Sequence, residues 1–203
     1  MDFHGIKQPG SAFPEEQMMI SGKARITIVT PFYNAGKYFR QTVCSVLSQT
    51  FPWFEWVIVD DGSSRQDDAA MLDRLSRSDE RIVVVHQKNH GLAHARNTGI
   101  RIAKTDLIVP LDADDLISPQ YLEYVFFGLY FHPSAAWCYT DVVGFGEQEY
   151  LWRYTWNAKK LKRYNFLTAT AAIRKKALME TGGYKIEKNS YYEDWRLWLE
   201  FLE

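Results

Sequence analysis

Runs of consecutive apolar residues alternate with segments of helical period between residues 25 and 146. A strand that is apolar at every position is covered on both faces, whereas a half-exposed strand alternates apolar with polar residues. The pattern therefore predicts an α/β fold, with a mostly parallel, Rossmann-like central sheet flanked by helices on both faces. The runs that predict strands are 24–33, 54–64, 81–87, 106–115 and 135–145.

The segments between these runs place apolar residues on one helical face. In the first segment the spacing i, i+4, i+7, i+8 is that of a helix, with Phe39, Val43, Val46 and Leu47 on the apolar face. Further helices are predicted from Asp67 onward, over 91–104, and from Ser118-Pro119, where a cap hydroxyl precedes a proline. Gly99 is expected where its helix packs closely on a strand.

The two ends of the chain depart from this alternation. Residues 1–24 show no sustained period, so we expect a weakly ordered N-terminal tail before one domain over 25–203. Late in the chain the pattern predicts a strand, a short helix ended by Gly182-Gly183, and a final helix with Ser190 and Glu193 at capping-box spacing. That helix has no stop signal, so the chain is expected to continue, and peripheral membrane association would arise through that missing segment.

Composition narrows the class of protein. The net charge of −1 offers no attraction to nucleic acid. The longest apolar run, 124–131, is too short to span a bilayer, and the N-terminus has no signal-peptide core, so a cytoplasmic location is expected, which includes the inner face of the membrane.

Cys44 and Cys138 are predicted to be buried free thiols. Aromatic residues, 15% of the chain, crowd its last third, where they serve either burial or stacking on sugars or a partner.

Polar residues gather where the predicted strands end. In open α/β sheets, ligands bind at the carboxyl ends of the strands, and the segments that follow these strands are 31–34, 60–64, 112–115 and 140–141. Three of the four segments are acidic, and oxygen-only clusters suit Mg²⁺ or Mn²⁺ beside substrate phosphates. The alternative for 112–115 is a solvated turn, in which Asp115 stabilises the start of the next helix. Arg96 is expected either to grip a phosphate or to be a surface charge.

Five motifs occur in order along the chain: TPFYNAGKYFRQTVCSVLSQTF, EWVIVDDGSS, NHGLAHARNTGI, LDADD and GGYKIEKNSYYEDW. Together they resemble glycosyltransferase family 2, the inverting enzymes of the GT-A fold, and the resemblance covers about residues 25–201. It implies a nucleotide-diphosphate-sugar donor, a Mn²⁺ or Mg²⁺ ion, and the hydroxyl of a glycan or lipid-linked acceptor. The oligomeric state is not implied.

The resemblance also implies roles for individual residues. Asp60 matches the position that accepts from a uracil ring N–H, which favours a UDP-sugar. Asp114 matches the metal ligand. Glu193-Asp194 match the acidic pair near the acceptor, with Asp194 as the general base. The full set of nucleotide-binding matches is Pro31, Tyr33, Asp60, Arg96 and Asp112.

Alternatives remain open at this point. Both acids of the pair also suit the first turn of a helix, where Glu193 fits a capping box. A truncated or non-catalytic nucleotide-sugar-binding module is the second hypothesis. No G-x-G-x-x-G follows the first strand, which argues against a dinucleotide-dependent oxidoreductase. A two-carboxylate sugar hydrolase would not need nucleotide-type loops. The Gln-x-x-Arg-Trp motif of processive synthases does not occur, which favours the addition of a single sugar.

Overall fold

A six-stranded sheet organises the chain, in the spatial order β3-β2-β1-β4-β8-β5. The computed structural model describes residues 22–147, 149–185 and 192–203. Strands β1 to β4 are parallel, and β8 runs antiparallel to both β4 and β5. The mostly parallel sheet predicted from the sequence is therefore confirmed. Its strands are β1 (Ile26–Phe32), β2 (Phe54–Asp60), β3 (Ile82–His86), β4 (Leu107–Pro110), β5 (Trp137–Cys138) and β8 (Ala172–Arg174).

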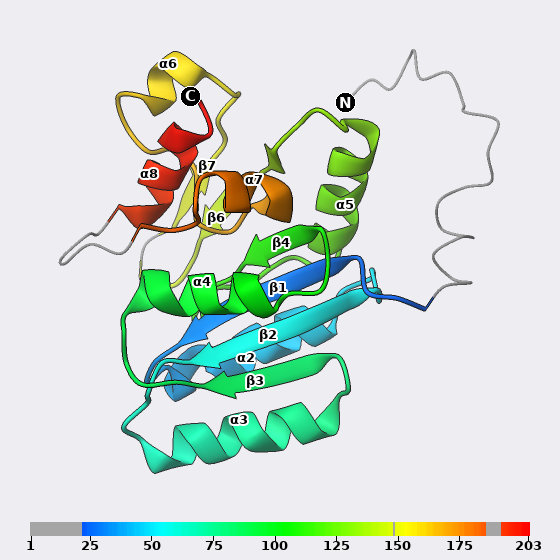
Figure 1. Cartoon of the computed structure of the whole chain (residues 1–203), viewed down its shortest axis with the longest axis vertical. Coiled ribbons are helices and arrows are strands. Elements are labelled where there is room, and N and C mark those ends of the chain that lie inside the picture. The colour runs from blue at the N-terminus through cyan, green and yellow to red at the C-terminus, as the bar shows by residue number, and fades with distance from the viewer. Residues whose placement is uncertain (1–21, 148, 186–191) are drawn as a thin grey trace.

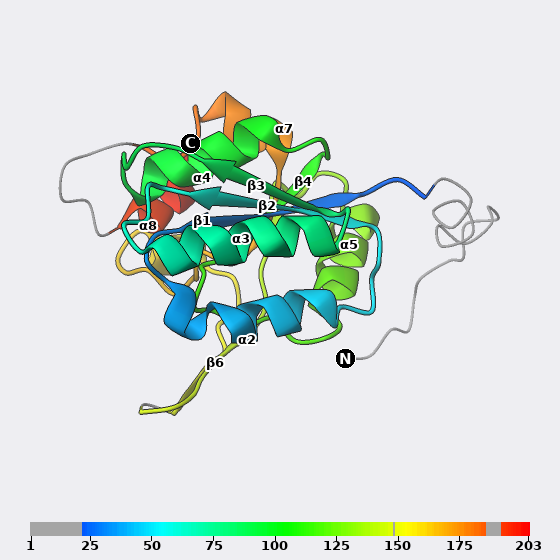
Figure 2. The ribbon, with the colours of Figure 1, turned by 90° about the horizontal axis from the view of Figure 1, so that it is seen from below.

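Helices cover both faces of this sheet, as Figure 2 shows. Successive residues of a strand point to opposite faces, and Ile28 accordingly packs in one hydrophobic core while Val29 packs in the other. The first core includes side chains of α2 (Gly36–Leu47), α3 (Gln66–Ser78) and α5 (Tyr121–Phe131). The second includes side chains of α4 (Leu92–Ile102), α7 (Lys175–Glu180) and α8 (Glu193–Glu200).

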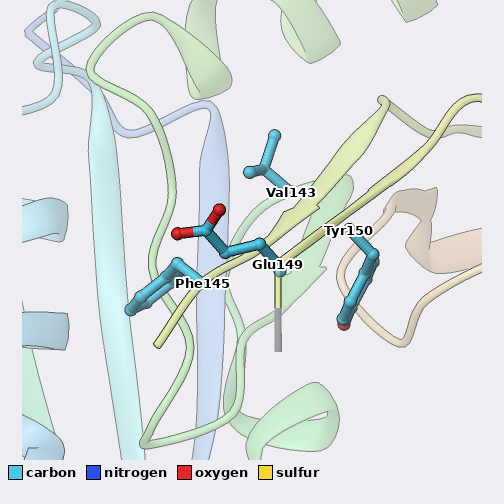
Figure 3. A pocket seen from close by; sticks show the side chains of 5 residues that line it. Val143, Phe145, Glu149 and Tyr150 are labelled. Carbon is cyan, nitrogen blue, oxygen red and sulfur yellow. The ribbon is translucent and has the colours of Figure 1, made fainter. Parts of the chain in front are cut away.

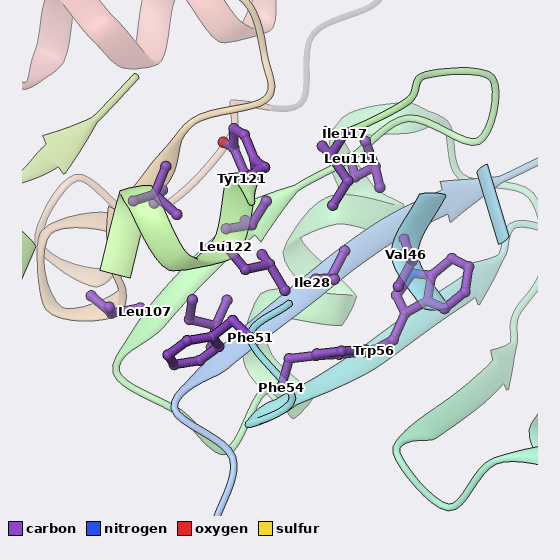
Figure 4. Close-up of a cluster of buried hydrophobic side chains, with 14 of the residues drawn as sticks. Ile28, Val46, Phe51, Phe54, Trp56, Leu107, Leu111, Ile117, Tyr121 and Leu122 are labelled. Carbon is purple, nitrogen blue, oxygen red and sulfur yellow. The ribbon is translucent and has the colours of Figure 1, made fainter. Parts of the chain in front are cut away.

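The first core is centred on large side chains from β1, β2 and α5 (Figure 4). Trp56 is fully buried, and its ring Nε1 donates a hydrogen bond to Oγ1 of Thr30 at 2.9 Å. Phe39 of α2 packs on the same ring with 5.7 Å between the centroids. Burial of each such side chain contributes about 1.5–3 kcal/mol, so this core fixes α2 and α5 against the sheet.

The close approach of α4 to the sheet occurs at Gly99, as predicted. An ideal Cβ built on Gly99 would lie 2.3 Å from Cγ1 of Val29 in β1. Real Cβ atoms do not come this close to another carbon, because protein interiors are already packed to crystal density. Glycine at this position therefore lets α4 lie directly on β1.

The prediction of a single fifth strand over 135–145 is wrong. This segment divides into β5, which joins the sheet, and β6 (Val142–Gly144), which pairs with β7 (Tyr150–Trp152) in a separate hairpin. Figure 2 shows the hairpin projecting away from the body of the molecule. The polar pair Thr140-Asp141 breaks the apolar run, and Asp141 instead pairs with Arg153 at 2.7 Å on the surface.

Two predicted helix boundaries shift. The helix expected from Ser118-Pro119 begins at Tyr121, because the Tyr121 N–H is bonded to the Ser118 carbonyl at 2.9 Å in a turn that precedes the helix. The final helix ends at Glu200 rather than at the last residue. The short helix α7 ends before Gly182-Gly183 as predicted, with both glycines in the left-handed region at φ of 78° and 76°.

The burial predicted for the two cysteines is wrong for Cys44, whose side chain is exposed on α2, whereas Cys138 is half-buried. Both thiols are free, as predicted. Residues 1–21 of the expected tail, and Ser190 of the expected capping box, lie outside the described residues. Of the helices in the described ranges, none combines the length and apolar character that a bilayer crossing needs.

Candidate active site

The predicted nucleotide-binding loops leave the sheet at one edge, where the arrowheads of the parallel strands in Figure 1 point. In the sheet register Phe32 lies beside Asp60, and Val29 lies beside Pro110. Tyr33, Asp60 and Asp112 therefore leave or end three neighbouring strands on the same side. Pro31 is buried within β1, whereas Tyr33 is 52% exposed and available to a ligand.

Asn34 joins the loop after β1 to the loop after β2. Its Oδ1 accepts from the backbone N–H of Ser64 at 3.0 Å, and its own N–H donates to Oγ of Ser63 at 3.0 Å. The backbone of Asn34 has a φ of 53°, in the left-handed region that asparagine tolerates better than most residues. The two loops are thus fixed relative to each other before any ligand arrives.

Asp60 is buried at the end of β2, 3% exposed, and both of its carboxylate oxygens have partners. Oδ1 accepts from the Ser63 N–H at 2.9 Å, and Oδ2 lies 2.8 Å from Nδ1 of His86. The hydrogen bond that His86 makes to Asp60 raises the pKa of His86, desolvation opposes this rise, and Asp73 adds to it. Each carboxylate oxygen has a second lone pair, so the uracil contact predicted for Asp60 remains compatible with these partners.

Sequence reasoning gave no role to Asp61, which is also 3% exposed. Its Oδ2 accepts from the Gly91 N–H at 2.7 Å, and its Oδ1 accepts from the His90 N–H at 3.0 Å and from Nε2 of Gln87 at 2.6 Å. Asp61 therefore holds the loop that leads into α4. The signal in the sequence was the doubled aspartate after a strand, where one acid faces the ligand side and the next can bond to backbone N–H groups.

Arg96 is the centre of the site. It lies on α4, only 1% of its surface is exposed, and its guanidinium bonds to two carboxylates from distant parts of the chain. NH2 donates to Asp112 after β4 at 2.7 Å, and NH1 donates to Glu193 at the start of α8 at 2.7 Å. The ring of Tyr184 lies 5.1 Å from the guanidinium carbon. The alternative of a surface charge is therefore wrong, because Arg96 is buried, whereas the phosphate contact of Arg96 stays a prediction.

The charge balance of the Arg96 bridge follows from its burial. Desolvation works to lower the pKa of Arg96, but the two carboxylates, Asp112 first, outweigh it and raise the pKa above its usual range. A buried charge of this kind is stable only when it is paired. Within the described residues Nε of Arg96 is buried and has no hydrogen-bond partner.

Asp112, Asp114 and Asp115 lie together in the turn after β4. Desolvation, followed by the charges of Asp112 and Asp114, raises the pKa of Asp115 to about 6, although part of this residue is open to solvent. Asp112 is engaged by Arg96, whereas Asp114 is exposed and has no ion pair within the described ranges. This turn therefore gathers three carboxyl groups, of which Asp114 and Asp115 are exposed and have no ion pair within the described ranges.

No group of three or more His, Cys, Asp or Glu side chains in the described ranges is arranged to hold a metal ion. The residues present still fit a hard divalent cation, because Mg²⁺ and Mn²⁺ commonly take one or two protein carboxylates and complete their shell with phosphates and water. Asp114 is the residue available for such a contact. The gathering of Asp60, Asp112 and Asp114 around one cation, which the sequence suggested, is not preformed.

Asp194 lies in the first turn of α8, next to Glu193. Its Oδ1 accepts from the Trp195 N–H at 2.7 Å, and its Oδ2 accepts from Nδ2 of Asn165 at 3.1 Å. Desolvation raises the pKa of Asp194, and these hydrogen bonds partly offset the rise. Glu193 bonds to Arg96, and its capping role stays a prediction, because its capping-box partner Ser190 lies outside the described residues. Asn165 was not predicted.

The described surface also has an open hollow of about 390 Å³ on the β6–β7 hairpin (Figure 3). It is lined by Val143, Gly144, Phe145, Glu149 and Tyr150. Figure 3 shows Glu149 as the only labelled carboxylate beside these apolar side chains. None of the strand-end residues lines this hollow, so the chemistry of the site belongs to the sheet edge and not to the hairpin.

Proteins with similar sequences and structures carry the name glycosyltransferase. GlyG of Streptococcus pneumoniae, a glycosyltransferase, is 37% identical over 102 residues, which are 50% of this chain and 34% of that protein. Staphylococcus aureus TarS 1–349 in complex with UDP superposes with a TM-score of 0.68 at 21% identity, over 85% of this chain and 53% of TarS. This chain therefore spans about half or less of the length of these proteins.

A second solved structure has the same fold. The mannosyltransferase PcManGT of Pyrobaculum calidifontis, solved with GDP-Man and Mn²⁺, superposes with a TM-score of 0.65 at 19% identity, over 85% of this chain and 51% of that one. These likenesses confirm the GT-A fold that the sequence predicted. Residues 27–196 match the family described as Glycosyl transferase family 2, and the chain belongs to that family.

Proposed function

We propose that this chain catalyses inverting transfer of a sugar from a UDP-sugar to a hydroxyl of a glycan or lipid-linked acceptor. The observation that carries the proposal is the Arg96 bridge, in which the guanidinium nitrogens lie 2.7 Å from a carboxylate oxygen of Asp112 and 2.7 Å from one of Glu193. It joins the turn assigned to the donor to the first turn of α8, where Asp194 is assigned as the base. Donor and acceptor would meet across this bridge.

The donor side is assigned to the loops after β1, β2 and β4. Tyr33 offers an exposed ring to the nucleoside, and Asp60 offers a lone pair to a uracil ring N–H. Arg96 and Asp112 lie towards the ribose and phosphates. TarS was solved with UDP and with UDP-GlcNAc, which supports uridine, whereas PcManGT was solved with GDP-Man. Guanosine is therefore the competing nucleotide to be tested.

Charge develops on the diphosphate as the bond to the sugar breaks. A Mn²⁺ or Mg²⁺ ion held by Asp114 and by the diphosphate oxygens would stabilise that charge. The solvent exposure of Asp114, and its lack of an ion pair in the described ranges, support this assignment. The Mn²⁺ in the structure of PcManGT is consistent with it.

Asp194 is assigned to take the proton from the acceptor hydroxyl. Its raised pKa makes it a stronger base than an exposed aspartate, and a positioned base contributes about 10²–10⁴-fold to the rate. The hydroxyl attacks from the face opposite the departing diphosphate, which inverts the anomeric carbon. Glu193 keeps the acidic pair in place through its bond to Arg96.

Hydrolysis or transfer of UDP-GlcNAc, measured with Mn²⁺, tests the base. We expect Asp194→Asn to lower turnover by about 100-fold or more while donor binding persists. Asp67→Asn is the matched control, because Asp67 also lies in the first turn of a helix, α3, and is exposed. Equal turnover in the wild type and Asp194→Asn would contradict the proposal. Donor binding without turnover dependent on Asp194 would favour the second hypothesis, a nucleotide-sugar-binding module.

The nucleotide is tested by thermal shift with UDP and GDP, each with and without Mn²⁺. A ligand that binds only the folded state raises the melting temperature by mass action, by an amount that grows with its concentration over Kd. We expect UDP with Mn²⁺ to give the largest rise. A rise with GDP and none with UDP would contradict the uridine assignment.

A further inference from the structure

The chain before β8 carries an exposed cluster of basic residues. Residues 150–164 contain no aspartate or glutamate. Four bases lie in and after the short helix α6 (Ala158–Leu161), and all four are exposed. None of the four has an ion pair with a described residue, which leaves their charge uncompensated; they are Lys159, Lys160, Lys162 and Arg163.

Three aromatic rings are interleaved with these bases and packed on one buried ring, Phe166. The centroids of Tyr154, Trp156 and Tyr164 lie 5.4, 6.4 and 6.1 Å from the centroid of Phe166. Each of the three residues is nevertheless 39–43% exposed. One part of each ring is therefore held in place while another part is open to solvent. The four bases and three aromatic residues are called the basic–aromatic segment below.

The basic–aromatic segment borders Asp194. Nε1 of Trp195 donates to the carbonyl oxygen of Leu161 at 2.7 Å, and Asn165 bonds to Asp194 at 3.1 Å. Tyr164 precedes Asn165 directly, so its Cα lies about 3.8 Å from the Cα of a residue that touches the carboxylate. Any molecule that offers a hydroxyl to Asp194 has this segment as a neighbour.

We propose that the basic–aromatic segment binds the acceptor, and that the acceptor is an anionic glycan with carboxylate or phosphate groups in its repeat. This inference rests on the function proposed above. The exposed parts of these aromatic residues suit the apolar C–H faces of sugars, because an aromatic ring offers an apolar face. The unpaired bases suit an anion, and a neutral glycan would leave their charge uncompensated.

An anionic membrane surface would also attract these bases. The rings, however, are packed against Phe166. Leu161 and Asn165, which adjoin the bases and Tyr164 in the chain, are hydrogen-bonded to Trp195 and to Asp194. That location is where an acceptor hydroxyl has to lie, and it gives a lipid headgroup no particular advantage. The position of the segment therefore favours the glycan over the membrane.

Binding to defined polymers in the absence of donor tests the inference. The probes are polygalacturonate, poly(glycerol phosphate) and neutral dextran, followed by tryptophan fluorescence. The variant replaces Lys159, Lys160, Lys162 and Arg163 with Gln. The control replaces four exposed bases remote from the segment, Arg74, Arg77, Arg101 and Lys104, with Gln, and it removes the same charge.

We expect one or both anionic polymers to bind, dextran to bind weakly, and affinity to fall as salt rises. The segment variant should raise Kd by about 10- to 100-fold and the control by about twofold or less. Tyr164→Ala, a smaller change, should also weaken binding and test the ring. Equal loss in segment and control variants, unchanged affinity in the segment variant, or dextran binding as strong as the anionic polymers would overturn the inference.

Two further outcomes separate this inference from the proposed function. Binding to vesicles of about 30% phosphatidylglycerol, lost in the segment variant while neither anionic polymer binds, would replace the glycan with a membrane surface. Donor turnover that depends on Asp194 with no polymer binding would overturn the acceptor inference alone. Polymer binding without donor binding would contradict the proposed function, on which the acceptor role depends.

Discussion

Asn165 donates a hydrogen bond from its Nδ2 to Oδ2 of Asp194 over 3.1 Å. The orientation of this amide is determined by its other end, because Oδ1 of Asn165 accepts from the Leu167 N–H at 3.1 Å. The Trp195 N–H holds the second oxygen of Asp194 at 2.7 Å. Both oxygens of the assigned base are thus positioned by groups outside the strand-end loops.

Asn165→Ala should raise the pKa of Asp194 further, so that more of the assigned base is protonated and inactive at low pH. The Asn165 hydrogen bond lowers the pKa of Asp194 against the rise caused by desolvation, so its loss should move the acid limb of the pH–kcat profile to higher pH. We expect kcat below neutral pH to fall by roughly tenfold, the value of a weak hydrogen bond to a charged group. The measurement is donor turnover across a pH series.

Asn157→Ala is the control for Asn165. Asn157 caps α6, where its Oδ1 accepts from the Lys160 N–H at 2.9 Å, and its loss should cost about 1 kcal/mol of stability without shifting the pH profile. Identical pH profiles for the wild type and Asn165→Ala would refute a positioning role for Asn165.

Arg96→Gln should destabilise the fold strongly. The substitution leaves Asp112 and Glu193 without their cation, and breaking a buried ion pair costs about 3–5 kcal/mol. Arg153→Gln is the matched control, since Arg153 pairs with Asp141 at the same 2.7 Å but is 73% exposed. An exposed pair contributes about 1 kcal/mol or less. Denaturant unfolding should show a larger loss of stability for Arg96→Gln than for Arg153→Gln. Equal losses of stability would contradict the role of Arg96 as a buried ion-pair bridge.

The pair of His86 with Asp60 predicts a pH-dependent contribution to stability. Asp60 raises the pKa of folded His86 above its usual value, so the folded state binds the proton more tightly. This contribution is fully present below the unfolded pKa of about 6.5 and is lost as the pH rises through the folded pKa.

We therefore expect His86→Ala to lower the melting temperature more at about pH 5.5 than at about pH 9. His132→Ala is the control, because His132 is exposed and its ring has no carboxylate partner within the described ranges. A deficit for His86→Ala that stays constant across the pH series would show that the ion pair does not form.

Gly99→Ala should destabilise the protein by about 1–3 kcal/mol, the typical cost of overpacking a core. The new Cβ would lie 2.3 Å from Cγ1 of Val29. Val29→Ala removes that atom, so the double variant should lose less stability than the sum of the two single variants. Additive losses in a double-mutant cycle would contradict the close packing of α4 on β1.

The parallel part of the fold could be predicted because its signals are local. Strands β1 to β4 are apolar at nearly every position, and the acids that follow them are visible in the sequence. The partners of Arg96 could not be predicted from local pattern. They lie 16 and 97 positions away along the chain, and only the tertiary fold brings the turn after β4 and the start of α8 to Arg96.

The direction of β8 explains why Asn165 was missed. Residues that follow a parallel strand lie at the carboxyl edge, so the strand pattern predicts site residues only in the segments after strands. Because β8 runs antiparallel to β4, the residues that precede it lie there instead. The prediction of a single fifth strand was wrong for a related reason. An apolar run does not reveal that its two halves pair with different partners.

The antiparallel strand β8 also differs from β1, β2 and β4 in how much sequence change the segment beside it can tolerate. The loops after β1, β2 and β4 continue strands with long ladders, since β1 pairs with β2 over seven residues and with β4 over four. Altering their anchor points would disturb these ladders. The stretch entering β8 leads into a three-residue strand that pairs with β4 and with β5 through two residues each. Under the acceptor role proposed above, we expect insertions or replacements there to change the choice of acceptor while the nucleotide-binding loops stay the same.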